Sequence, residues 1–110
     1  MNSYVVTGLL AEARDGKRVI VLSENGAGAR HVFELLADEA GSEVAIRRRH
    51  GEESISFPDS DGRIHFSSVR SGLRGWVADV VFVDCDPTIE QLQVLAPVVA
   101  SRRGGRVVLR

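Results

Sequence analysis

The chain has 110 residues, of which 44% are hydrophobic, and its formal net charge is −1 at pH 7. This length and composition favour one folded domain over residues 1–110 and exclude a disordered chain. The one cysteine excludes an internal disulfide framework and any zinc site built from several cysteines. The apolar runs are too short to span a bilayer, and Met1–Tyr4 lacks the basic and apolar regions of a secretory signal, so we expect a cytoplasmic protein.

The first half of the chain predicts a helix, a strand and a second helix. Apolar residues at helical spacing indicate a helix from about Ser3 to Asp15. The continuous apolar run at 19–22 is typical of a buried parallel strand. A tight turn at 23–28 then leads into a helix whose apolar stripe extends from Ala29 to Ala40.

The middle of the chain changes to a two-residue period, which predicts strands. We expect an edge strand that includes the arginine run at 47–49, followed by an antiparallel hairpin over about 53–68. The segment Pro58–Gly62 supplies the turn of this hairpin because its residues favour tight turns. A loop at 71–76 follows.

The last third predicts a strand at 79–84, a third helix and a final strand at 106–110. Asp86 is expected to cap the helix, with Pro87 at its first position. Pro97 should kink this helix. We expect its buried stripe to consist of Leu92, Leu95, Ala96 and Val99.

Two short segments are candidate ligand sites. Asn25, Gly26 and Gly28 form a turn between a strand and a helix, where exposed amides can bind phosphate. A dinucleotide-binding turn would need a third glycine where this chain has His31, so a plain flexible turn is the alternative. Asp84 ends an apolar strand, where α/β sheets bind ligands, but no phosphate-binding loop accompanies it and we expect no metal and no cofactor.

The densest positive charge is Arg47-Arg48-Arg49, with Arg70 and Arg74 further along the chain. Arginines in such a pattern can contact the phosphate backbone of nucleic acid without reading its sequence. The alternative is a solvated edge strand whose charges discourage aggregation. The sequence leaves both interpretations open.

Read in order, these segments resemble the ATPase domain of phage terminase large subunits, P-loop NTPase motors that package DNA. The resemblance extends over most of the chain. It rests on a strand after the first helix, a hairpin, an Arg-Gly loop and a magnesium-binding strand, at Gly16–Leu22, Ser54–Phe66, Ser71–Gly75 and Asp79–Asp84. It implies a three-layer α/β sandwich with a short parallel sheet of strands 19–22, 79–84 and 106–110 beside the hairpin at about 53–68. The strand at 79–84 would be central, the second and third helices would share one face, and the first helix would cover the other.

Two departures from the family decide the expected function. Met1-Asn2-Ser3 stands where the family has the end of its phosphate loop, and Cys85 stands where it has a catalytic glutamate. Asp84 and Cys85 are therefore vestigial positions of the magnesium strand. Since a thiol cannot replace the carboxylate base, the resemblance implies a phage-like protein without ATPase activity.

Four functions follow from this comparison. We expect first a degenerate ATPase core that binds DNA or a protein partner. The second is a homodimeric or motor-docking regulator that pairs through an exposed sheet edge at Val107, Val108 and Leu109. The third is a split ATPase completed by a partner chain, and the fourth is a gene fragment that folds without a selected role. No membrane partner is expected.

Overall fold

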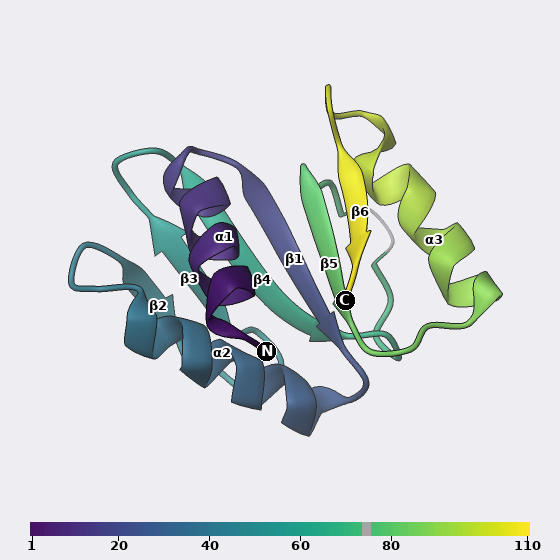
Figure 1. The fold of residues 1–110 in the computed structure, drawn as a ribbon, viewed down its shortest axis with the longest axis horizontal. Coiled ribbons are helices and arrows are strands. Elements are labelled where there is room, and N and C mark those ends of the chain that lie inside the picture. The colour runs from purple at the N-terminus through teal and green to yellow at the C-terminus, as the bar shows by residue number, and fades with distance from the viewer. Residues whose placement is uncertain (74–75) are drawn as a thin grey trace.

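The computed structural model describes residues 1–73 and 76–110, which form a mixed six-stranded sheet with helices on both faces (Figure 1). The elements in chain order are α1 (Ser3–Arg14), β1 (Arg18–Ser23), α2 (Gly26–Glu39), β2 (Ala45–Arg47), β3 (Ser54–Phe57), β4 (Gly62–Ser68), β5 (Val80–Asp84), α3 (Ile89–Ala100) and β6 (Arg106–Leu109). None of the helices within the described residues is long and apolar enough to cross a membrane.

The strand order is β2-β3-β4-β1-β5-β6. The predicted parallel group is confirmed, because β5 lies between β1 and β6 and runs parallel to both. The predicted hairpin is also confirmed as the antiparallel pair β3 and β4, and β2 is the edge strand beside it. The sequence did not predict that β4 also pairs parallel with β1, which joins the hairpin and the parallel strands into one sheet.

The expected placement of the helices is wrong. α1 and α2 pack together on one face of the sheet, while α3 lies on the opposite face against β5 and β6 (Figure 1). The reason is the position of β4. The connection through α2 carries the chain from β1 toward β4, whereas α3 carries it from β5 toward β6, in the opposite direction. Right-handed crossovers that run in opposite directions place their helices on opposite faces.

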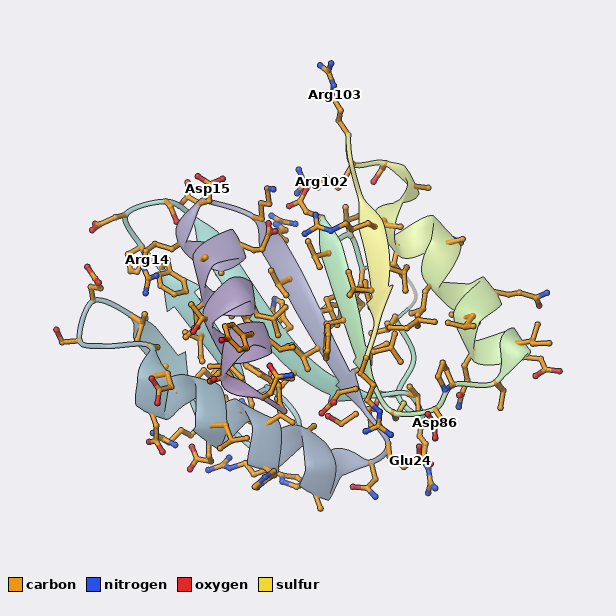
Figure 2. All side chains as sticks on the ribbon, viewed as in Figure 1. Arg14, Asp15, Glu24, Asp86, Arg102 and Arg103 are labelled. Atoms are coloured by element: carbon orange, nitrogen blue, oxygen red, sulfur yellow. The ribbon has the colours of Figure 1, made fainter. Side chains whose placement is uncertain are left out.

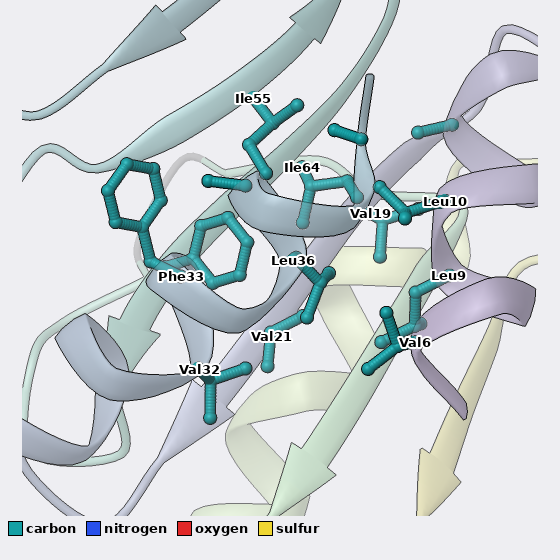
Figure 3. Close-up of a cluster of buried hydrophobic side chains, with 14 of the residues drawn as sticks. Val6, Leu9, Leu10, Val19, Val21, Val32, Phe33, Leu36, Ile55 and Ile64 are labelled. Atoms are coloured by element: carbon teal, nitrogen blue, oxygen red, sulfur yellow. The ribbon is translucent and has the colours of Figure 1, made fainter. Parts of the chain in front are cut away.

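The larger core lies between the sheet and the pair α1 and α2 (Figure 3). It is built from alternate strand residues and from the helix stripes that face them. Its members include Val6, Leu9, Leu10, Val19, Val21, Val32, Phe33, Leu36, Ile55 and Ile64. A smaller core on the other face joins Ile20, Leu22, Val81, Val83 and Cys85 to Leu95 and Val98 of α3.

The start of α3 differs from the prediction. Thr88 caps the helix rather than Asp86, because the Thr88 hydroxyl accepts a bond from the Gln91 amide while the Gln91 side chain accepts one from the Thr88 amide. This capping box satisfies two amides, whereas Asp86 is fully exposed. Pro97 lies inside the helix as predicted. The buried positions are Leu95 and Val98, and the predicted Ala96 is exposed.

Candidate functional site

The carboxyl ends of the parallel strands bring the predicted magnesium-strand residues to one edge of the sheet. Figure 2 shows Glu24 and Asp86 at this edge. Arg110 lies 3.9 Å from the Asp84 carboxylate and 3.8 Å from that of Asp86, so this arginine offsets both charges. Among the described residues, no group of three or more His, Cys, Asp and Glu side chains is placed to hold a metal ion.

Cys85 is buried in the smaller core rather than directed to a reaction centre. Burial is the largest cause that raises the pKa of the Cys85 thiol, and the carboxylates of Glu24, Asp84 and Asp86 raise it further, while Arg110 acts in the opposite direction. The thiol therefore stays protonated at neutral pH. A protonated, buried thiol is neither a general base nor a reactive nucleophile.

The turn predicted to bind phosphate lies at the start of α2. Asn25 caps the helix, because its side-chain oxygen accepts a bond from the Gly28 amide at 2.8 Å and its carbonyl accepts one from Ala29 at 3.0 Å. The side chain of Ser23 is buried here without a hydrogen-bond partner among the described residues. Phosphate binding by Asn25, Gly26 and Gly28 stays a prediction.

Each member of the arginine run at 47–49 has an acidic partner. Arg47 and Arg49 both pair with Glu52, at 3.1 and 2.8 Å. Arg48 pairs with Glu34 of α2, and its guanidinium lies 5.4 Å from the centre of the Phe33 ring. Only Arg47 of the run belongs to β2.

The other two predicted arginines lie in or beside the connection from β4 to β5. Arg70 lies 3.8 Å from Glu24 at the carboxyl edge. Arg74 falls outside the described residues. The structure therefore does not gather the five predicted arginines into one described surface.

Sequence reasoning missed a basic surface on the sheet itself. α3 packs over β5 and β6, which leaves the same face of β2, β3 and β4 without a covering helix (Figure 1). Strand alternation and register place polar side chains on this surface. We call it the open face, and it consists of Arg18, Arg47, Ser54, Ser56, Arg63 and His65.

Two arginines of the open face have no acidic partner among residues 1–73 and 76–110. Arg18 and Arg63 face one another across the parallel pair β1 and β4, and both are exposed. The ion pairs between described residues involve neither guanidinium. The alternation in Gly62–Ser68 could have revealed Arg63 and His65, because Ile64 and Phe66 mark the opposite, buried face of that strand.

The pKa of His65 is lowered by burial and by the positive charge of the open face. Desolvation is the largest cause that lowers the pKa of His65, and the charges of Arg63 and Arg18 act in the same direction, so that together they bring it to about 4. Its ring packs edge-to-face on Trp76, with the ring centres 4.6 Å apart. The imidazole is therefore neutral at neutral pH.

The depressed pKa of His65 predicts a pH-dependent stability. The unfolded chain takes up a proton near pH 6.5, whereas the folded chain takes it up only near pH 4. The free energy of unfolding should therefore be highest above pH 6.5 and fall as the pH is lowered toward 4. His65→Gln should flatten this fall in urea unfolding curves, and His31→Gln, an exposed change on α2, should not. Equal slopes for His65→Gln and the wild-type chain would contradict the prediction.

The sheet edge that the sequence predicted to pair with a second chain is the side of β6 that faces away from β5. β6 pairs with β5 and is the last strand in the order, so its other side has no partner strand among the described residues. Arg106 and Arg110 donate backbone bonds to Asp79 and Val83. Since alternate residues of a parallel strand bond to the same neighbour, the amides of Val107 and Leu109 point away from the sheet.

The chain matches no family model, no curated protein and no solved structure. The chemistry of the described residues is therefore the basis for proposing a function.

Proposed function

We propose that this protein is a nucleic-acid-binding module without catalytic activity of its own. The observation that carries the proposal is the open face, where Arg18 and Arg63 are exposed and lack acidic partners in the described part of the chain. Unpaired guanidinium groups on a surface favour phosphate, which they can bind through two hydrogen bonds. The net charge of −1 does not oppose this binding, because a local basic surface acts at short range in salt.

Arg47 of the arginine run extends the basic surface along its outer edge. Register places Arg47 opposite Ser54, and Ser54 opposite His65, so Arg47 belongs to the same row of the open face. The pair of Arg47 with Glu52 is exposed at both side chains, at 56% and 48%. Exposed ion pairs contribute little stability, so a phosphate can replace this glutamate at small cost.

The proposed scaffold is a degenerate terminase-like ATPase core. The order β1-β5-β6 is the order that this resemblance implies, and the position of the family's catalytic glutamate holds the buried thiol of Cys85. The pairs of Arg110 with Asp84 and Asp86 support the same proposal, because they give these acids a structural role. A split ATPase remains the alternative, and a complex whose ATP hydrolysis disappears in Asp84→Asn would favour it.

The first test measures the binding of short labelled oligonucleotides by fluorescence anisotropy at several salt concentrations. The wild-type chain should bind, and its affinity should fall steeply with salt because bound phosphates release counterions. Replacing Arg47, Arg48 and Arg49 with alanine should weaken binding and make the salt dependence shallower by about 0.7–0.9 for each phosphate that the variant no longer binds.

Arg103→Ala is the control for this triple variant. Figure 2 shows Arg103 projecting from the turn between α3 and β6. β6 is the edge strand at the opposite side of the sheet from β2. Its removal should change neither the affinity nor the salt dependence. Failure of the wild-type chain to bind any oligonucleotide would refute the proposed function.

The second candidate function is self-association through β6. It is favoured by the outward amides of Val107 and Leu109 and by the 54% exposure of the Leu109 side chain. Strand edges of this kind pair with a second chain. A mass that doubles with concentration in the wild-type chain but not in Leu109→Pro would support it, since proline removes only an outward donor there.

A further inference from the structure

A pocket in the open face combines positive charge with an aromatic ring. It is lined by Arg18, Ile20, Arg63, His65, Trp76 and Val77 and has a volume of about 330 Å³. This volume is at the lower end of the range for small-molecule sites. The buried side chain of Ile20 belongs to this lining, and β1, β4 and the segment before β5 supply the residues.

Trp76 is held at one side of this pocket and remains open to solvent. His65 packs against it edge-to-face, with an angle of 83° between the rings, and the Trp76 amide donates to the Leu73 carbonyl at 3.0 Å. The Trp76 side chain is nevertheless 37% exposed. A positioned aromatic ring that is partly exposed can stack on a planar ligand with little loss of conformational entropy.

The arginines of the same pocket supply the complementary charge. Arg18 and Arg63 are opposite one another in the register of β1 and β4, so both side chains leave the sheet at the same position along the strands. Asp79 lies near Arg18, but its carboxylate accepts a bond from the Arg18 amide at 2.8 Å and lies 3.8 Å from Arg102. The acid is thus engaged by other groups, and the Arg18 side chain remains available for an anion.

We propose that this pocket binds single-stranded nucleic acid, with one base stacked on Trp76 and the adjoining phosphates bound by Arg18 and Arg63. The inference rests on the proposed nucleic-acid binding and names the form of nucleic acid that is bound. A single strand presents an unstacked base together with its phosphates more readily than a duplex, because the bases of a duplex are paired and stacked on one another. A sheet face with exposed aromatic and basic side chains is suited to this mode of binding.

Trp76 itself provides the direct measurement, because it is the chain's one tryptophan. Titration of the whole chain with a short single-stranded oligodeoxythymidine should quench its fluorescence as the base stacks on the indole ring. A duplex of equal length should bind more weakly and quench less. The two titrations use the same buffer and salt concentration, since phosphate binding depends on both.

Variants separate stacking from charge. Binding by the Trp76 variants, which lack tryptophan, is measured by the fluorescence anisotropy of a labelled strand. Trp76→Ala should weaken single-strand binding by about 5- to 150-fold, the range found when a stacked aromatic ring is removed, and Trp76→Phe should retain most of the affinity. Arg63→Gln should weaken binding and reduce the salt slope by about 0.7. Arg14→Gln removes the same charge from the opposite face, where Arg14 lies over Phe57, and should change neither value.

Each result decides the inference. Quenching by the single strand together with the loss in Trp76→Ala supports it. Equal or tighter binding of the duplex with unchanged Trp76 fluorescence overturns it but leaves nucleic-acid binding in place. Single-strand binding that Trp76→Ala does not weaken overturns the stacking role, and absence of binding to both forms overturns the proposed function as well. Circular dichroism of each variant shows whether the fold is retained.

Discussion

Gly62→Ala is expected to destabilise the protein by about 3 kcal/mol, the upper part of the usual range for an overfilled site. Gly62 begins β4 directly beneath the end of α1, and a Cβ atom there would overlap the carbonyl group of Ala13. Backbone cannot yield as a flexible side chain does, so α1 would have to move off the sheet. Ser60 also joins α1 to the start of β4, because its hydroxyl donates to the Ala13 carbonyl and accepts from the Gly62 amide, both at 3.2 Å.

Gly8→Ala is the matched control for this prediction. Gly8 lies in α1, on an exposed side, and an added Cβ there meets no atom within 4 Å. The same substitution should therefore stabilise the chain by about 0.5–1 kcal/mol, because alanine is the better helix former. Urea unfolding of the two variants should give shifts of opposite sign. Equal stability of Gly62→Ala and the wild-type chain would show that α1 does not approach β4 this closely.

Phe33→Ala is expected to cost about 3–5 kcal/mol of unfolding free energy. The Phe33 side chain is completely buried in the larger core and packs edge-to-face on Phe66 of β4, with ring centres 5.4 Å apart. Its ring also supports Arg30 and Arg48, whose guanidinium groups lie 5.3 and 5.4 Å from its centre. Its removal therefore opens a cavity between α2 and the sheet and takes away the support beneath these two arginines.

Two substitutions make this prediction specific. Phe33→Leu fills part of the cavity and should cost less than Phe33→Ala. His31→Ala changes an exposed residue of the same helix and should lie within about 0.5 kcal/mol of the wild-type chain. Thermal or urea unfolding gives all three values. A similar loss for His31→Ala would contradict the prediction, because removing an exposed side chain would then cost as much as opening a cavity in the core.

The corner between α2 and the arginine run has a structural role that the sequence did not suggest. Glu53 is a buried carboxylate, 3% exposed, and lies 3.7 Å from Arg30. Arg30 also donates to the Arg48 carbonyl at 2.7 Å. These contacts join α2 to the segment after β2. Arg48 of the basic run thus takes part in the packing of the fold, whereas the side chains of Arg18 and Arg63 are available to bind a ligand.

Local patterns in the sequence were sufficient for the elements themselves. Helical spacing in α1 and α2, the apolar run of β1 and the alternation of β3 and β4 all correspond to described elements. These patterns depend on which face of a single element is buried, and the spacing of apolar residues within that element is enough to show it. The central place of β5 was also correct, although the expectation came from a resemblance rather than from periodicity. The start of α3 was less predictable, because Asp86 and Thr88 are both suitable caps and only Thr88 has Gln91 three residues later.

The residues alone were enough to predict a mixed α/β domain, its strands and the basic character of several segments. Which arginines are free to bind a ligand became apparent only from the folded arrangement. Arg47, Arg48 and Arg49 are conspicuous in the sequence but meet glutamates in space, whereas Arg18 and Arg63 are far apart in the chain and become neighbours only because β4 pairs with β1. The physical reason is that an ion pair or an uncovered sheet face depends on strand pairing over long sequence separations, which no local pattern records.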